Sequence, residues 1–230
     1  MIKLSAFRYA PVSLKPSFWM ESADFETVVE DDDIVKNDDV LFYKRLLENG
    51  LTVQNEKNNY LYLHLNGSHA PYHMDENGKW VDESDVIQQT KGCFNILFAY
   101  MDEMKKLGLY KDATIVILGD HGWDTNKIGF FVKPRGSADM PLTQNNAPIS
   151  THNLLPTLLK SEGFEYSAYG VPVFDVEQNT NGERLMIRYA RTGESVRYYK
   201  IVGDPDIPEN LELISERDFL VDLNGGLPVN

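Results

Sequence analysis

The stretch Ala113-Thr114-Ile115-Val116-Ile117-Leu118-Gly119-Asp120-His121-Gly122 joins an apolar run to a short polar turn bounded by glycines. A run of aliphatic and β-branched residues that ends at glycine is typical of a buried strand, and ligand sites in α/β proteins gather where strands end. The flanking glycines let the backbone turn, so that two consecutive side chains can reach one ion. We therefore predict that Asp120 and His121 are metal ligands.

The chemistry of this pair favours particular metals. A carboxylate and an imidazole suit zinc or manganese, whereas calcium and magnesium prefer oxygen ligands alone. The alternative is a polar strand-to-helix turn in which Asp120 caps a helix and His121 lies at the surface. Two ligands are fewer than a metal site needs, so the choice depends on the rest of the chain.

Composition excludes several classes of protein. The 230 residues are 42% apolar and 25% charged, as expected for a soluble globular protein with one large domain or one domain and a small appendage. The net charge of −13 comes without a basic stripe, which argues against nucleic acid as a partner. No apolar stretch approaches the roughly 18–20 residues needed to cross a bilayer. The single cysteine, Cys93, excludes an internal disulfide, and we predict a buried structural thiol.

A second group of polar residues follows another predicted strand. Residues 59–65, Asn-Tyr-Leu-Tyr-Leu-His-Leu, alternate as a strand does and lead into the loop 66–72. A long helix is predicted from Ser84 or Asp85 to Gly108, followed by the strand 113–118. Such strand–helix–strand crossovers are nearly always parallel, so both strand ends face one edge of the sheet. This predicts that His64 and His69 lie beside the Asp-His pair.

The other segments have simpler patterns. We predict an amphipathic helix from about residue 38 that stops at Gly50, and a helix that starts at Ser150 or Thr151 and ends at Gly163. A strand is predicted at 128–134, and two antiparallel strands at 184–190 and 196–202 with Gly193 at their turn. Residues 1–36 are predicted to be irregular, with the acidic run 30–33 in a solvated loop, and an acidic tail is predicted after residue 202.

Four segments, in order, resemble the alkaline phosphatase superfamily, and within it the sulfatase-like group that includes phosphoethanolamine transferases and lipoteichoic acid synthases. The likeness covers about residues 59–163. Asn153 stands where many relatives are expected to have aspartate. The segments are 64–72 (His-Leu-Asn-Gly-Ser-His-Ala-Pro-Tyr), 88–92 (Gln-Gln-Thr-Lys-Gly), the strand that ends in Gly-Asp-His-Gly, and 146–150 (Asn-Ala-Pro-Ile-Ser) leading into 154–159.

The resemblance implies a fold. It implies an α/β three-layer sandwich with a mostly parallel central sheet flanked by helices, plus a small C-terminal antiparallel strand element. Residues 1–165 would form the carboxyl-terminal portion of the sulfatase-like domain with an irregular N-terminal segment. Residues 166–230 would form an antiparallel subdomain packed on it.

The resemblance also implies roles for residues. In the family the Asp-His pair binds the catalytic divalent metal, which matches Asp120 and His121. The histidines of the first segment contact substrate or a second metal, so His64 and His69 are predicted catalytic and substrate-binding residues, with Asn66 as a further substrate contact.

The function implied is that of a sulfatase-like hydrolase, or of a phosphoethanolamine or glycerol-phosphate transferase, acting on sulfate or phosphate esters of the cell envelope that can be lipid-linked. Family members carry a nucleophilic Thr, Ser or modified Cys on an earlier turn, and no such pattern precedes Tyr60. We therefore expect this chain to be the metal-binding portion of a longer protein, partnered by a missing N-terminal half and with little turnover alone. The resemblance implies an extracytoplasmic location, with the full-length protein membrane-anchored.

Two alternatives stay open. One is a non-catalytic binding or interaction lobe in which the histidines and Asp120 are structural, and whose metal binding would be indifferent to Asp120→Ala. The other is a phosphomutase or nucleotide phosphodiesterase of the same superfamily, which should supply more Asp and His ligands after position 121 than this chain does.

Overall fold

The structure is a computed structural model that describes residues 38–53, 59–189 and 195–218. These residues belong to two compact units that divide between Ala113 and Thr114. The predicted irregular segment 1–36 with its acidic run, the predicted turn at Gly193 and residues 219–230 of the predicted tail lie outside the described residues. The predicted boundary between residues 165 and 166 falls inside the unit that begins at Thr114 and stays a prediction.

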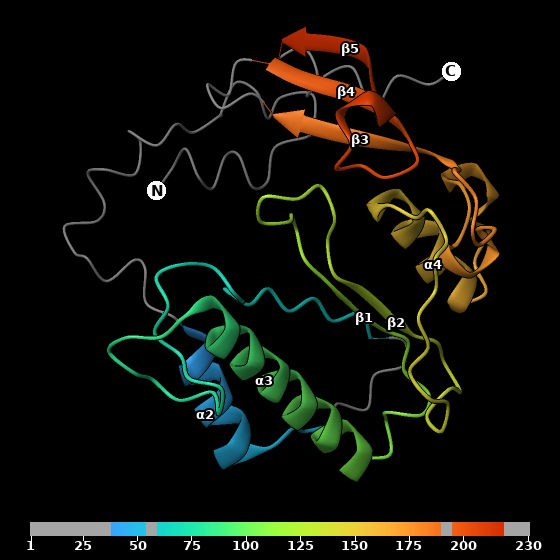
Figure 1. The fold of residues 1–230 in the computed structure, drawn as a ribbon. Helices are drawn as coiled ribbons and strands as arrows, with labels where there is room; N and C mark the ends of the chain where they lie inside the picture. The colour runs from blue at the N-terminus through green and yellow to red at the C-terminus, as the bar shows by residue number, and fades with distance from the viewer. Residues whose placement is uncertain (1–37, 54–58, 190–194, 219–230) are drawn as a thin grey trace, which may run out of the picture. The chain divides into compact units, whose positions relative to one another are not determined.

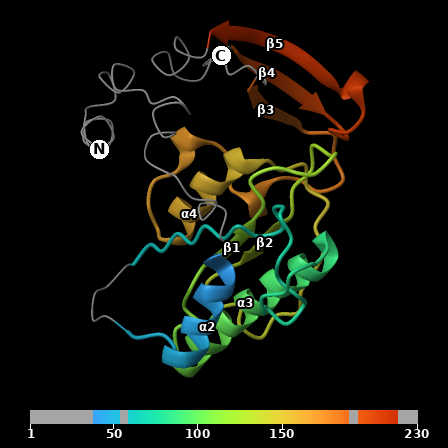
Figure 2. The same cartoon turned by 90° about the vertical axis from the view of Figure 1, so that its left-hand side faces the viewer.

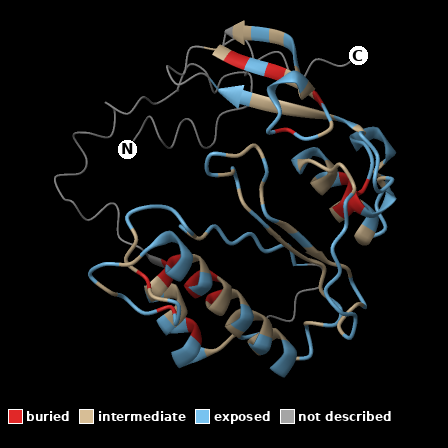
Figure 3. Ribbon diagram, viewed as in Figure 1, coloured by how far each residue is buried: buried red, intermediate tan, exposed pale blue. Residues whose placement is uncertain are grey.

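The unit that ends at Ala113 is built on two helices, α2 (Asp38–Asn49) and α3 (Val86–Lys106), which lie side by side (Figures 1 and 2). Both confirm helices predicted from the sequence. The buried core of this unit lies between them, as the red segments of Figure 3 show. It consists of Met74, Cys93 and Ile96, against which Val40, Phe42, Tyr43 and Leu65 pack.

Local chemistry explains where α3 begins and ends. The Asp85 carboxylate accepts hydrogen bonds from the backbone N–H groups of Ile87 and Gln88 at 2.8 and 2.9 Å, which caps the first turn. Gly108 follows the last turn with a φ of 72°, a left-handed conformation that glycine adopts without strain. Midway, Cys93 is buried as predicted, and this burial raises the pKa of its thiol to about 12.

The prediction of a strand at residues 59–65 is wrong. The rings of the alternate residues Tyr62 and His64 lie 6.1 Å apart, but residues 59–65 form no strand. Tyr60 and Tyr62 are 76% and 70% exposed. A strand requires a neighbouring backbone to bond, and none of the described residues supplies one. The predicted strand–helix–strand crossover is therefore not formed by the described residues.

The other unit contains two antiparallel sheets. Strands β1 (Ile115–Leu118) and β2 (Phe130–Lys133) confirm the predicted strands at 113–118 and 128–134, and they pair with each other. The strands formed by the described residues belong to this sheet and to a second, three-stranded sheet. All pairings within both sheets are antiparallel. The three-layer fold with a mostly parallel sheet stays a prediction.

The second sheet has the order β3-β4-β5, with β3 at Glu183–Tyr189, β4 at Ser195–Val202 and β5 at Leu211–Asp218. The pairing of β3 with β4 confirms the predicted antiparallel strands. Strand β5 was not predicted and lies within the segment expected to be an acidic tail; its residues 211–213 and 215–218 pair with the central strand β4. The central strand buries Val196, Tyr198 and Ile201, so it carries the apolar face of the sheet.

Helix α4 (Leu154–Ser161) follows a single 3-10 turn, η4 (Thr151–Asn153), and confirms the predicted helix. The Asn153 side chain accepts a hydrogen bond from the backbone N–H of Ser150 at 2.8 Å, which explains its place at the helix start. Buried Thr157 accepts a bond from the backbone N–H of Val173 at 2.8 Å. Three further 3-10 turns are η5 (Ser167–Tyr169), η6 (Val173–Asp175) and η7 (Pro208–Asn210). Among the described helices, none has the length and hydropathy of a membrane span.

Candidate functional site

The predicted metal ligands lie at the start of the loop that joins β1 to β2, residues 119–129, which we call the Asp-His loop. The side chains of Asp120 and His121 are 79% and 66% exposed, and Asp120 Oδ2 lies 3.8 Å from His121 Nε2. Bends, not a helix, follow this pair. The alternative in which Asp120 caps a helix is therefore wrong.

The side chains of Asp120 and His121 each keep one atom that can bind a metal after their hydrogen bonds are made. Asp120 Oδ1 accepts the backbone N–H of His121 at 3.0 Å, so Oδ2 is the oxygen that faces the imidazole. His121 Nδ1 lies 2.9 Å from the carbonyl oxygen of Gly122. Because a carbonyl only accepts, Nδ1 carries the proton, and Nε2 of the neutral ring has a free lone pair.

The donor set and spacing fit a divalent metal. Bonds from zinc to imidazole nitrogen and to carboxylate oxygen are each about 2.0–2.2 Å long. Two such bonds together exceed the 3.8 Å between Oδ2 and Nε2, so one ion can contact both atoms. No group of three or more His, Cys, Asp or Glu side chains that could hold a metal occurs within residues 38–53, 59–189 and 195–218. The pair thus offers two donor atoms, fewer than a metal site needs, and its role as a metal site stays a prediction.

The Asp-His loop folds back on itself so tightly that there is no room for a side chain at Gly122. A Cβ atom at this position would lie 2.3 Å from the Lys127 carbonyl oxygen and 2.4 Å from that of Thr125. Real Cβ atoms do not approach backbone oxygens this closely. The glycine after the Asp-His pair therefore lets the tip of the loop pack directly behind His121.

Two aspartates of the connection between β4 and β5 hold the tip of the loop; we call Asp204 and Asp206 the aspartate clamp. Asp206 accepts hydrogen bonds from Thr125 Oγ1 at 2.7 Å and from the backbone N–H of Asn126 at 2.6 Å. Lys127 Nζ lies 2.8 Å from Asp204 Oδ2 and 3.2 Å from Asp206 Oδ2. The clamp and the loop belong to the same compact unit.

These contacts shift the pKa of each charged group. The bond from Lys127 holds the pKa of Asp204 below its usual value, and the Asn126 N–H is the main cause of the lowered pKa of Asp206. The bond to Asp204, reinforced by Asp206, raises the pKa of Lys127. Sequence reasoning missed the clamp because its partners lie 77 to 81 residues apart and share no periodic pattern.

The other predicted residues lie in the unit that ends at Ala113, on residues 64–69, which we call the histidine loop. His64, Asn66 and His69 are all exposed. The His69 Nδ1 atom donates to the carbonyl oxygen of Ala70, which leaves its Nε2 with a free lone pair, as in His121. His64 has its ring against Tyr62. The three side chains therefore face solvent on one short loop.

Two buried polar side chains, neither of them predicted as a site residue, fix the histidine loop. The carboxylate of Asp39, on α2, accepts the backbone N–H groups of Asn66 and Gly67 at 3.0 and 2.9 Å. Gln89, on α3, is fully buried; its Nε2 donates to the carbonyls of Gly67 and His69 at 2.9 and 2.8 Å, and its Oε1 accepts the backbone N–H of His73 at 2.9 Å. Burying polar groups is costly unless they are bonded, so this loop is firmly held.

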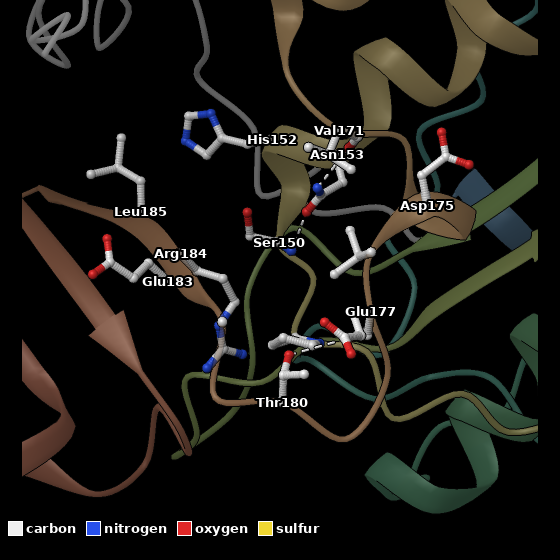
Figure 4. A pocket seen from close by; sticks show the side chains of 13 residues that line it. Ser150, His152, Asn153, Val171, Asp175, Glu177, Thr180, Glu183, Arg184 and Leu185 are labelled. Carbon is white, nitrogen blue, oxygen red and sulfur yellow. Dashed lines mark hydrogen bonds between the residues drawn. The ribbon is translucent and has the colours of Figure 1, made fainter.

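A pocket of about 390 Å³ lies beside β3, next to the start of α4 (Figure 4). Its charged lining is mixed. Arg184 and His152 supply cationic or ionisable nitrogen, whereas Asp175, Glu177 and Glu183 are acidic. Asp175 and Glu183 are already paired with Lys160 and Lys200. The pocket contains neither Asp120 nor His121, and its mixed charge does not single out an anionic ligand.

Comparison with known proteins gives a distant relationship. No family model matches the chain, and no solved structure shows significant similarity to it. Among curated proteins it is similar to the lipoteichoic acid synthases of Staphylococcus aureus strains USA300, NCTC 8325 / PS 47 and COL, each 24% identical over 180 residues. The match covers 64% of this chain and 27% of each relative, so the chain spans about a quarter of the length of these proteins. At this coarse level the comparison agrees with the predicted resemblance.

Proposed function

We propose that this chain is the metal-binding portion of a sulfatase-like enzyme related to lipoteichoic acid synthase, acting on a phosphate ester of the cell envelope. The observation that carries the proposal is the Asp120–His121 pair, with Oδ2 and Nε2 both available and 3.8 Å apart. The distant likeness to lipoteichoic acid synthase favours phosphate over sulfate. Among the groups that the family resemblance implies, we propose glycerol phosphate as the one transferred. The ester is then lipid-linked, and the full-length protein is membrane-anchored with this portion outside the cytoplasm.

Different residues of this chain are assigned different roles. Asp120 and His121 would hold zinc or manganese, which when bound polarises a phosphoryl oxygen and stabilises developing negative charge. The Gly122 carbonyl keeps the proton of His121 on Nδ1, so that Nε2 can bind without first losing a proton. The attacking hydroxyl is not assigned to a residue of this chain.

The histidine loop supports a complementary role. His69 Nε2 accepts a hydrogen bond when the ring is neutral and donates one when it is protonated, so it can bind an ester oxygen or give a proton to the leaving alcohol. His64 and Asn66 add exposed donors on the same loop. Asp39 and Gln89 fix the loop backbone before substrate binds, which lowers the ordering cost of binding.

Metal titration tests the proposal on the chain itself. We expect Zn²⁺ followed by calorimetry, and Mn²⁺ followed by paramagnetic broadening, to show weak binding that Asp120→Asn removes. The matched control is Asp124→Asn, which removes the same charge from the same exposed loop without touching the Asp-His pair. Metal binding that is equal in both variants would refute the assignment and favour the non-catalytic lobe.

An ester-hydrolysis assay is a second, independent test of the proposed function. With nitrophenyl phosphate and nitrophenyl sulfate we expect little or no turnover by this chain, because the nucleophile is not among its assigned residues. Robust turnover that depends on Asp120 would overturn the view that this chain is an incomplete catalytic unit.

A further inference from the structure

We propose that Asp206, assisted by Asp204, is a positioning residue for the Asp-His pair, so that the C-terminal sheet sets metal affinity through a carboxylate that does not touch the ion. This inference rests on the proposed metal-binding role of Asp120 and His121. It gives a function to the β4–β5 connection, whose two aspartates bond to residues 125–127 of the Asp-His loop.

The first link joins the clamp to the tip of the loop. Both oxygens of Asp206 are used, Oδ1 by the backbone N–H of Asn126 and Oδ2 by Thr125 Oγ1 and Lys127 Nζ. Asp204 pairs with the same lysine at 2.8 Å. The turn that carries the aspartate clamp thus holds the three consecutive residues 125–127.

Asn126 is held from two sides. Its Nδ2 donates to the carbonyl oxygen of Pro205 at 2.6 Å, and its Oδ1 accepts a bond from Arg188 on β3. Pro205 is buried although both neighbouring aspartates are exposed, so the turn that carries the clamp is anchored in the protein. The tip of the loop therefore has a fixed position relative to the C-terminal sheet.

The second link joins the tip to the metal ligands. The carbonyl oxygens of Thr125 and Lys127 occupy the space where a Cβ of residue 122 would lie, within 2.4 Å of it. The Gly122 carbonyl oxygen in turn accepts the hydrogen bond that His121 Nδ1 donates. Displacing residues 125–127 would therefore move the Gly122 carbonyl. The His121 ring would then lose the hydrogen bond that orients it and keeps its proton on Nδ1.

The experiment compares Asp206→Asn with Glu216→Gln in the complete chain. Glu216 is an exposed carboxylate on β5 that accepts bonds from Ser195 Oγ at 2.7 Å and Arg197 Nε at 3.1 Å, so this control removes an equivalent paired charge from the same sheet. Substituting groups that orient metal ligands typically lowers affinity 10- to 100-fold. We expect Asp206→Asn to raise the Mn²⁺ concentration that half-broadens the His121 ring signals about tenfold, and Glu216→Gln to change it less than twofold.

A metal-free readout separates this inference from the proposed function. Nitrogen-15 shifts of the neutral His121 ring report which nitrogen is protonated, and we expect Nδ1–H in the wild type and in Glu216→Gln but a mixture of both forms in Asp206→Asn. If wild type does not bind Mn²⁺ at Asp120 and His121, the proposed function fails while the proton placement still tests positioning. An unchanged half-broadening concentration together with unchanged proton placement in Asp206→Asn would overturn the inference.

A second variant covers loss of folding. Should circular dichroism show Asp206→Asn to be unfolded, Lys127→Gln removes both ion pairs with the clamp but keeps the backbone bond from Asn126 to Asp206. We expect a smaller shift in the same direction, about threefold in half-broadening concentration. No shift in a folded Lys127→Gln, with His121 protonation unchanged, counts against the inference.

Discussion

Gln89 offers the sharpest test of how the histidine loop is held, because a second glutamine precedes it and serves as its control. Gln89 is fully buried and makes three hydrogen bonds to the backbone of residues 67–73. Gln88 is exposed, and its side-chain amide reaches Asp85 Oδ2 at 3.3 Å. We predict that Gln89→Ala strongly destabilises the unit that ends at Ala113 and that Gln88→Ala does not.

The magnitude follows from the three bonds. Removing one partner of a buried hydrogen bond costs about 1 kcal/mol or more, because the other partner is left unsatisfied. Gln89→Ala leaves one N–H and two carbonyl groups in this state and opens a cavity. Water can reach these partly buried groups, so we expect a loss of about 2–4 kcal/mol in the free energy of unfolding. Gln88→Ala should stay within about 0.5 kcal/mol.

Urea unfolding followed by circular dichroism at 222 nm measures this difference. Among the described α-helices, α2 and α3 contribute 12 and 21 residues, against 8 in α4, so the helical signal of the described residues comes mainly from the unit that contains Gln89. With a urea slope of about 2 kcal/mol per molar, the midpoint should fall by about 1–2 M. A midpoint for Gln89→Ala equal to that of Gln88→Ala would refute the claim that these bonds hold the loop.

Three further predictions concern the glycine, the thiol and the clamp. Gly122→Ala should destabilise the Asp-His loop by about 1–3 kcal/mol, because its Cβ would meet two backbone oxygens, whereas Gly129→Ala, with a contact of 3.5 Å, should cost less; equal thermal midpoints would contradict this. Since burial raises the pKa of Cys93 to about 12, a disulfide reagent at pH 8 should label it only after denaturant is added, and rapid labelling of the folded chain would be the opposite result. Because the pKa of Asp206 is lowered in the folded chain, its contacts stabilise the fold fully above pH 3.8 and are lost as the pH falls through that lower pKa. Because the pKa of Lys127 is raised in the folded chain, its contribution is complete below pH 10.5 and is lost as the pH rises through that higher pKa. The Asn126 amide signal should therefore titrate with a midpoint below 3.8, and a midpoint above that value would show that the contact to Asp206 is not made.

Local signals predicted the local structure. Asp85 and Gly108 fixed the ends of α3, because an N-cap carboxylate and a left-handed glycine act within one turn of the helix. The consecutive placement of Asp120 and His121 between glycines predicted that both side chains reach a common point, and Oδ2 and Nε2 lie 3.8 Å apart. Their role as metal ligands stays a prediction.

Long-range pairing is where the sequence was insufficient. The alternation of residues 59–65 indicates an extended chain, but a strand also needs a partner that alternation cannot identify. Strand β5 was missed for the opposite reason, because its residues 211–217 include three charged side chains and resemble a solvated tail, yet β4 offers them a partner. The clamp was missed because hydrogen bonds between Asp206 and residues 125–126 leave no trace in either local pattern.

The exposed segment 60–64 has a consequence for how copies of the chain behave in solution. No backbone hydrogen bond joins these residues to another described residue, and Tyr60, Leu61, Tyr62 and Leu63 are exposed, so this apolar segment can pair with the same segment of a second copy. The net charge of −13 keeps copies apart at low ionic strength. Salt shortens the range of that repulsion from about 10 Å at 0.1 M to about 3 Å at 1 M. Self-association through this segment should therefore grow with salt, so the chain is best handled in dilute buffer, and Tyr62→Lys should reduce its clustering.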